Sequence, residues 1–287
     1  MSRVAKFRTP LICWAPWGNL PSLRFKVTKV RQDKTVDSPF LSRNSPVEKK
    51  NLTTSEVEIW QISLARMGDS IQALRSLLSH DEIQRANRFA FEIDRSRFFI
   101  ARAAMRQILG GYMGIAPQEL TFSYSQNGKP ELHAEFEKAG LTFNLSHSRE
   151  LALLAVTRGA SRVGIDVEFV DHEFPGEEIV ERFFSVSEMK TLHGVPANQR
   201  ADAFFCCWTR KEAYVKALGE GLSVPLHSFD VSFGPNAPAA LMHVSTHPDE
   251  ISRWSMYEIN VPRGYRAALV VEGSGHVLGH HQWNMEF

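Results

Sequence analysis

The chain of 287 residues is 43% hydrophobic and 23% charged, which is typical of soluble globular proteins, and its length predicts about two domains. This composition argues against a disordered chain, a collagen-like repeat or a coiled coil. The apolar runs are far too short for a membrane-spanning helix of about 20 residues. A net charge of +1 gives no general attraction to nucleic acid or to an anionic membrane, and three cysteines cannot build a disulfide framework. We therefore expect a cytoplasmic protein that binds neither nucleic acid nor a membrane.

The first 32 residues stand apart because they carry seven Lys and Arg and no Asp or Glu. A basic segment without acidic residues is typical of organelle-targeting sequences, so an organellar location is the alternative to the cytoplasm. Prolines at positions 10, 16 and 21 would break an amphipathic targeting helix and favour a loosely attached arm. A Ser-, Pro-, Asn- and Lys-rich linker follows, so residues 1–54 are predicted to precede the folded part.

In residues 55–160, hydrophobic periodicity predicts strands around one long helix. Residues 56–64 alternate apolar and polar side chains, as a half-buried strand does. Ser79 followed by Glu82 resembles a capping box that opens a helix, and residues 94–113 have apolar side chains at helical spacing. Further strands are predicted at residues 121–124, 141–145 and 151–157.

Residues 161–287 repeat this order. A predicted strand at residues 162–170 is followed by a second helix-start signal, Ser185 with Glu188, and by a long predicted helix at residues 202–218. Further strands are predicted at residues 228–233, 254–260 and 266–271. The repeated order of strand, helices and strands predicts an α+β fold with two similar halves.

Two carboxylates, Asp166 and Glu168, lie in the predicted strand at residues 162–170. Because a strand has a period of two, both side chains project from the same face and repel each other. A divalent cation would relieve this repulsion, and Mg²⁺ favours one or two carboxylates together with phosphate oxygens and water. The alternative is the exposed polar face of an edge strand, and the spacing alone does not exclude it.

A third acidic residue lies on the long predicted helix, in the segment WTRKEAYVKALGEGL (208–222). Glu212 and Lys216 are one helical turn apart and therefore share a face of the helix. One interpretation is a surface ion pair of little energetic value. The other is a third oxygen ligand for the cation, beside a lysine that contacts a phosphate.

The segment FNLSHS (143–148) sets Ser146 beside His147 at the end of a predicted strand. Adjacent residues of an extended chain point to opposite faces, so these two cannot easily act as nucleophile and base for each other. Contact with a phosphate or a nucleotide fits the hydroxyl and the imidazole better, and a histidine satisfied within the core is the alternative. Lys129 and some of the arginines on the predicted helices of the first half would extend such an anion site, although most of these arginines are expected to be solvated. The arginines are Arg85, Arg88, Arg95, Arg97, Arg102 and Arg106.

Together, these segments resemble the Sfp-type 4′-phosphopantetheinyl transferases. The segments that carry the resemblance are RANRF (85–89), NGKPEL (127–132), FNLSHS (143–148), VGIDVE (163–168), RFFSVSE (182–188) and WTRKEAYVKALGEGL (208–222). The most specific part is GIDVE followed, about 40 residues later, by W-x-x-K-E-x-x-x-K.

The resemblance implies two α+β halves related by a pseudo-two-fold axis, with the active site in the cleft between them. It implies an Mg²⁺-dependent enzyme that transfers the 4′-phosphopantetheine group from coenzyme A to a serine of an apo acyl, polyketide or peptidyl carrier protein. The second product would be adenosine 3′,5′-bisphosphate, and the enzyme would serve fatty acid, polyketide or nonribosomal peptide biosynthesis. Two halves in one chain could form the cleft without a second subunit, so a monomer is expected.

Carried over position by position, the resemblance also implies individual roles. The metal ligands would be Asp166, Glu168 and Glu212, and the coenzyme A contacts would be Arg85, Arg97, Lys129, Ser146, His147 and Lys216. Glu212 would in addition be the general base for the carrier serine, unless a metal-bound water takes that part, and Lys216 would contact the phosphates during catalysis.

The resemblance also places carrier docking at residues 179–192, where Phe183, Phe184 and Met189 would contact the carrier or belong to the core. Two other functions are compatible with the same residues. One is a different Mg²⁺-dependent phosphoester enzyme, and the other is a carrier-binding protein without catalysis.

Overall fold

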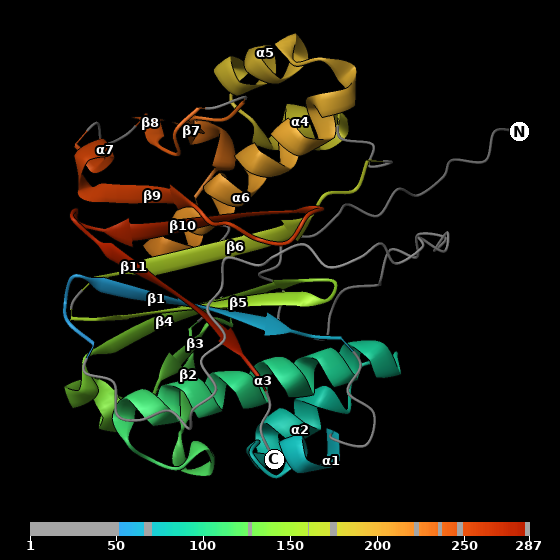
Figure 1. The fold of residues 1–287 in the computed structure, drawn as a ribbon. Coiled ribbons are helices and arrows are strands. Elements are labelled where there is room, and N and C mark those ends of the chain that lie inside the picture. The colour runs from blue at the N-terminus through green and yellow to red at the C-terminus, as the bar shows by residue number, and fades with distance from the viewer. Residues whose placement is uncertain are drawn as a thin grey trace, which may run out of the picture.

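The structure is a computed structural model of the chain and describes residues 52–65, 71–125, 128–159, 161–172, 177–220, 224–234, 237–245 and 249–284. The basic segment at residues 1–32 and nearly all of the predicted linker lie outside these residues. Leu52, near the end of the predicted linker, is buried in the hydrophobic core of the first half. Two β-sheets lie between two groups of helices, which are seen at opposite ends of Figure 1.

The first half surrounds one long helix with short elements. Its elements are β1 (Glu56–Ser63), α1 (Ile71–Arg75), α2 (His80–Ala86), α3 (Glu92–Met113), the 3₁₀ turn Pro117–Glu119, β2 (Phe122–Tyr124), β3 (Pro130–Leu132), the 3₁₀ helix Ala134–Ala139, β4 (Leu141–Ser148) and β5 (Leu151–Arg158). The predicted capping box is present, because the backbone N–H of Ser79 donates to the Glu82 carboxylate over 3.1 Å. Helix α3 ends at Gly114, which adopts the left-handed conformation with φ 70°.

The second half repeats this order around α6. Its elements are β6 (Val163–Phe169), α4 (Glu177–Phe183), α5 (Val186–Gly194), the 3₁₀ turn Ala197–Gln199, α6 (Arg200–Leu218), the 3₁₀ turn Leu226–Ser228, β7 (Phe229–Val231), β8 (Leu241–Val244), α7 (Glu250–Arg253), β9 (Trp254–Glu258), β10 (Tyr265–Glu272) and β11 (Val277–Trp283). The capping box of Ser185 and Glu188 opens α5 as predicted. Helix α6 ends at a second left-handed glycine, Gly219.

The two sheets share one strand order. The first sheet runs β11-β1-β5-β4 and the second runs β6-β10-β9, so β1, β5 and β4 correspond to β6, β10 and β9. The antiparallel hairpins β2-β3 and β7-β8 correspond in the same way. This repeat confirms the predicted α+β fold with two similar halves. Two halves related by a pseudo-two-fold axis would have the same strand order in both sheets, as is observed here. The axis itself and the cleft stay predictions.

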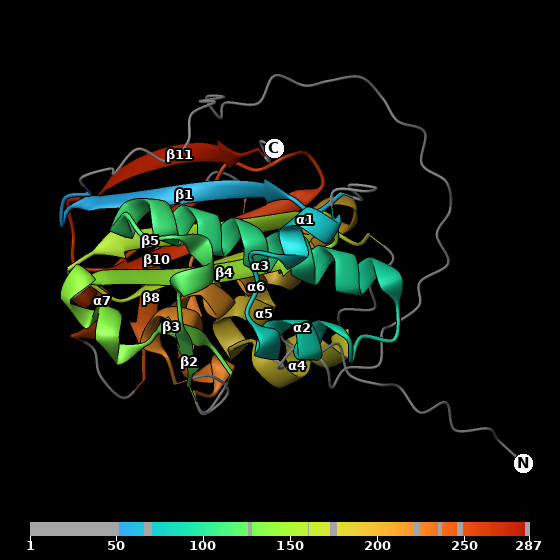
Figure 2. The same cartoon turned by 90° about the horizontal axis from the view of Figure 1, so that it is seen from below.

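Strand β11 leaves the second half and returns to the first, where it pairs in parallel with β1 (Figure 2). The predicted range 161–287 therefore supplies one strand of the first sheet. The sequence does not predict this strand, because VLGHHQW shows no apolar alternation. The strand lies at the edge of the sheet, and only Trp283 among its residues is buried.

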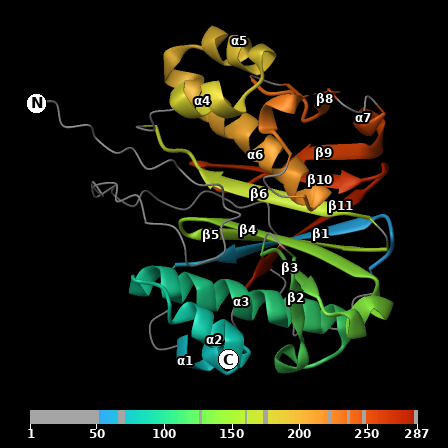
Figure 3. The same cartoon turned by 180° about the vertical axis from the view of Figure 1, so that it is seen from behind.

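Alternate residues of β6 face two different layers, which fixes the position of its acidic side chains. Val163, Ile165 and Val167 are fully buried in a core that also contains residues of β1, β5 and β10. The residues between them face α6. Figure 3 shows α6 and α3 on opposite sides of the two sheets.

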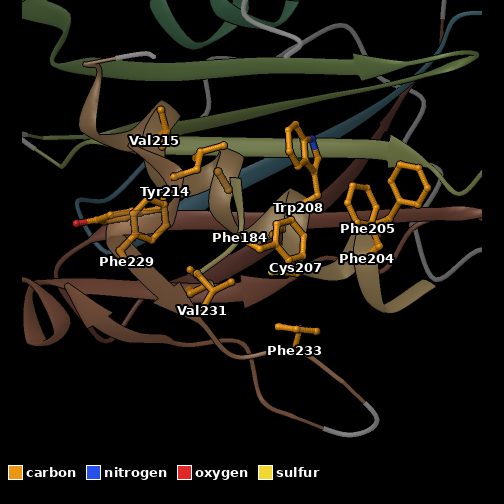
Figure 4. Close-up of a cluster of buried hydrophobic side chains, with 14 of the residues drawn as sticks. Phe184, Phe204, Phe205, Cys207, Trp208, Tyr214, Val215, Phe229, Val231 and Phe233 are labelled. Carbon is orange, nitrogen blue, oxygen red and sulfur yellow. The ribbon is translucent and has the colours of Figure 1, made fainter. Parts of the chain in front are cut away.

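The second half has an aromatic core of its own around α6 (Figure 4). The ring of Phe184 is stacked on Phe204 with centroids 5.3 Å apart, and Phe204 is stacked in turn on Trp208 at 5.9 Å. Burial of large aromatic rings is a major source of stability, so this core fixes α6 within the second half. In the part of the chain that the structure describes, no helix combines the length and hydrophobicity needed to cross a membrane.

Candidate active site

Gly164 of β6 sets the distance between this strand and α6. A Cβ atom at this position would lie 2.1 Å from the carbonyl oxygen of Ala213 and 2.4 Å from the backbone nitrogen of Ala217. Only a glycine allows the backbones to approach so closely. The period of two that brings Gly164 against α6 also turns Asp166 toward the same helix.

A buried cluster joins β6, α6 and β4 at this point. The ammonium group of Lys216 lies 2.5 Å from Asp166 Oδ1 and donates to Ser146 Oγ over 3.0 Å. The Ser146 hydroxyl donates to the same Asp166 oxygen over 2.9 Å. Lys216 is 2% exposed and Asp166 is fully buried, so the alternative of a surface ion pair is wrong for Lys216 and that of an exposed polar face is wrong for Asp166.

Glu212 is buried beside this cluster. The pKa of its carboxyl group is raised from 4.5 to about 8, chiefly by burial and in addition by the negative charges of Asp166 and Glu168, while Lys216 opposes the rise. The structure thus brings together three acidic side chains from two elements that are distant in sequence.

The donor chemistry of the cluster fits a hard divalent cation. Asp166 Oδ2 and Glu212 Oε2 are buried oxygens without a hydrogen-bond partner, which costs free energy unless a cation or a donor satisfies them. In the described residues, no group of three or more His, Cys, Asp or Glu side chains already stands in position to hold a metal ion. Lys216 supplies the positive charge that Asp166 contacts, so the carboxylates fit Mg²⁺ in chemistry but are not arranged around an ion.

Basic groups lie on the other sides of Lys216. Lys129 donates from Nζ to the backbone carbonyl of Lys216 over 3.0 Å, and burial lowers its pKa to about 8. Burial lowers the pKa of His147 to about 3, with Lys216 and Arg97 adding to this effect. Arg97 keeps a buried Nε without a hydrogen-bond partner. Such a collection of donors is suited to an anion.

A cavity of about 610 Å³ opens beside Lys129. Its walls come from the β2-β3 hairpin, the start of β4 and the end of α6, and they include Arg162, Phe136, Phe143 and Leu218. The cavity therefore combines apolar walls with two cationic side chains, Lys129 and Arg162, and two acidic ones, Glu131 and Glu137.

Two further predictions lie away from this cluster. Arg85 lies over the ring of Tyr124, with Cζ 5.5 Å from the ring centroid, and no interaction found among the described residues joins it to Asp166 or Glu212. Phe184 is buried in the core of the second half, and Phe183 and Met189 pack against that core. The core interpretation is thus confirmed for Phe184.

The signals for the site were unequal. The strand period that places Asp166 and Glu168 on one face also places Gly164 there. A glycine on that face is the one sequence signal for the close approach of α6. The pairing of Lys216 with Asp166 has no local signal, because it depends on how α6 packs on β6.

The same two halves are recognised by comparison with known proteins. A family model described as "4′-phosphopantetheinyl transferase superfamily" matches residues 162–270, and one described as "4′-phosphopantetheinyl transferase, N-terminal" matches residues 60–159. The 4′-phosphopantetheinyl transferase HetI of Nostoc sp. is 40% identical over 224 residues, covering 78% of this chain and 91% of HetI. The chain belongs to the 4′-phosphopantetheinyl transferase superfamily.

Other relatives agree with this membership. The 4′-phosphopantetheinyl transferase Sfp of Bacillus subtilis (strain 168) is 27% identical over 194 residues, covering 68% of this chain and 82% of Sfp. A crystal structure of Thermotoga maritima holo-[acyl-carrier-protein] synthase aligns with 40% of this chain and 64% of the synthase chain at 24% identity. Its TM-score of 0.30 is too low to establish a common fold. The chain is thus a 4′-phosphopantetheinyl transferase of the Sfp type, an enzyme class that transfers phosphopantetheine to carrier proteins.

Proposed function

We propose that this transferase uses coenzyme A as its donor, requires Mg²⁺, and releases adenosine 3′,5′-bisphosphate when it modifies a serine of an apo carrier protein. The observation that carries the proposal is the buried cluster of Asp166, Glu212 and Lys216, whose two partnerless carboxylate oxygens need a cation. The basic groups on the other sides of Lys216 supply donors for the phosphates of coenzyme A.

Glu212 is proposed to accept the proton of the carrier serine. A serine hydroxyl is a poor nucleophile until a base takes its proton. The pKa of Glu212 is raised to about 8 in the metal-free protein, and bound Mg²⁺ would lower this pKa and keep the carboxylate ionised, ready to accept a proton. The serine oxygen then forms a bond to the phosphorus that carries the pantetheine, and the bond from this phosphorus to the bridging oxygen breaks.

Lys216 is proposed to move its ammonium group from Asp166 to the diphosphate, where negative charge accumulates as the bond breaks. When bound by Asp166, Glu168 and Glu212, Mg²⁺ would supply Lewis-acid stabilisation of the same oxygens. The donor is proposed to be oriented by Ser146, His147, Arg97 and Lys129. The rest of the rate enhancement would then come from positioning the two reactants relative to each other.

The test is a mass measurement on an apo carrier protein incubated with the full chain, coenzyme A and Mg²⁺. We expect the carrier to gain the mass of one phosphopantetheine group and adenosine 3′,5′-bisphosphate to appear in equal amount. Cleavage of coenzyme A without a gain in carrier mass would instead indicate a phosphoester hydrolase. Binding of the carrier without either change would indicate a non-catalytic protein, and full activity in excess EDTA would contradict the Mg²⁺ requirement.

A further inference from the structure

Polar side chains of β4 cross the boundary between the two sheets. Asn144, Ser146 and Ser148 occupy alternate positions of β4, and each contacts β6, which belongs to the other sheet. The first of them accepts the backbone N–H of Ile165 at Oδ1 over 2.8 Å. Side chains of the first half therefore reach the strand that carries two of the acidic residues.

Ser148 makes two hydrogen bonds that fix the direction of its proton. Its hydroxyl oxygen accepts the backbone N–H of Phe169 over 3.1 Å and its hydroxyl donates to Glu168 Oε2 over 2.7 Å. A hydroxyl has one proton and a backbone N–H can only donate, so the proton is left for the carboxylate. Hydrogen bonds to ionised groups are about twice as strong as neutral ones, which favours one orientation of Glu168.

Asp166, the other acidic residue of β6, is held by different side chains. Asp166 is fully buried and is held by both Lys216 and Ser146. Glu168 is partly exposed and has a longer side chain, which loses more rotamer freedom when it is ordered. The hydrogen bond from Ser148 therefore limits the rotamers that are open to Glu168.

We propose that Ser148 is a positioning residue for Glu168, holding this carboxylate in a fixed orientation so that it is preorganised for Mg²⁺. The inference rests on the proposed function, because it takes Glu168 as a metal ligand. Ser148 itself needs no contact with the metal or with coenzyme A. Partners that orient a metal ligand are worth roughly 10- to 100-fold in metal affinity.

The test measures binding of Mn²⁺, as a paramagnetic substitute for Mg²⁺, to the full chain without coenzyme A or carrier. We expect Ser148→Ala to weaken Mn²⁺ binding by about 10-fold or more while the thermal unfolding midpoint stays close to that of the wild type. Ser148→Thr keeps the hydroxyl and should restore the affinity, and Ser148→Cys, with a weak donor, should fall between them.

Thr157→Val is the matched control, because it also removes a hydroxyl from the first sheet. Thr157 is fully buried on β5, and its hydroxyl donates to the backbone carbonyl of Glu56 over 3.2 Å. This loss should lower stability slightly and leave Mn²⁺ binding unchanged.

A double-mutant cycle with Glu168→Gln separates positioning from a general structural effect. If Ser148 acts through Glu168, Ser148→Ala should have no further effect on Mn²⁺ binding in the Glu168→Gln protein. An equal loss in both backgrounds, or wild-type binding by Ser148→Ala alone, would overturn this inference and leave the proposed function intact. A wild-type protein that binds no Mn²⁺ would overturn both the proposed metal site and the inference.

Discussion

The two halves of the molecule have the same order of elements, but the centre of the first strand is uncharged in one half and acidic in the other. When the ends of β5 and β10 are matched, the partner positions put Trp60 of β1 where β6 has Asp166. Counting back from the C-cap glycines of α3 and α6 puts Gln107 where α6 has Glu212. One half thus has acidic residues at positions where the other has neutral ones.

The first half has Trp60 and Gln107 at these positions, and both side chains contact β11. Trp60 is stacked on His281 of β11 with centroids 4.6 Å apart, and its Nε1 donates to the hydroxyl of Tyr112 over 3.0 Å. Gln107 accepts a hydrogen bond from Nε1 of Trp283, also on β11. The comparison teaches that equivalent positions of this scaffold hold either neutral side chains that are hydrogen-bonded to other neutral side chains or a buried charged cluster with partnerless carboxylate oxygens.

The largest effect is expected from Glu212→Gln, which removes the proposed base. We expect the rate of transfer to the carrier to fall by about 10²- to 10⁴-fold, with the fold unchanged, because a neutral amide cannot accept the serine proton. The measurement is the initial rate of carrier mass gain.

Gln107→Leu is the matched control in the first half. It removes the hydrogen bond to Trp283 and should cost about 1 kcal/mol of stability without changing the transfer rate. Similar losses of rate in both variants would show that the two positions do not differ in function.

A second prediction concerns two buried glutamates that the halves share. The Glu82 carboxylate accepts from Nε of Arg102 and of Arg106 over 2.7 Å and 2.6 Å. Among the described residues, Glu188 has one cationic partner, Lys211 at 2.8 Å, and also accepts the backbone N–H of Val231 over 2.9 Å. Removing one partner of a buried ion pair costs about 3–5 kcal/mol, because the other charge stays buried.

We therefore expect Glu82→Gln to lower the free energy of unfolding more than Glu188→Gln, since it leaves two buried cations instead of one. Lys211 keeps hydrogen bonds to two backbone carbonyls, and so does Arg106, so the ranking rests on the number of cations that lose their carboxylate partner. Urea unfolding measures both variants, and a larger loss for Glu188→Gln would contradict the ranking.

The last prediction is a pH dependence of stability that arises from Glu212. The folded chain holds this proton with a pKa of about 8, above the ordinary value of 4.5. Between these pH values the folded state binds more protons than the unfolded state, so stability falls as pH rises. This contribution is complete below pH 4.5 and is lost as pH rises through about 8.

The check is urea unfolding of the metal-free protein across this pH range. Glu212→Gln should have a flatter pH dependence than the wild type, because its amide does not titrate. Equal slopes in the two proteins would mean that Glu212 does not carry a raised pKa in the folded state.

Local patterns predicted much of this fold because they depend on neighbouring residues. The alternation in β1, the helical spacing in α3 and α6, and both capping boxes each follow from side chains within a few positions of one another. The period of two also gave the correct common face for Asp166 and Glu168. Strands β8 and β11 were missed because they are short or lie at an edge, with few buried residues.

Long-range contacts were beyond such patterns. Glu212 and Lys216 are neighbours on one helix, and sequence spacing alone suggests that they pair with each other. In the structure Lys216 pairs with Asp166 instead, because the missing side chain of Gly164 lets α6 approach β6. The roles assigned to these residues stay predictions, whereas their proximity is a property of the fold.

The return of β11 to the first sheet has a consequence for how the protein forms. This strand is synthesised later than every other described strand, yet it covers the edge of β1, which is among the earliest parts of the fold. Until the ribosome has made β11, the nascent chain exposes the backbone donors and acceptors of that edge, which invite pairing with other chains. A fragment containing only the first family-model region would keep this exposed edge permanently and would be prone to aggregate.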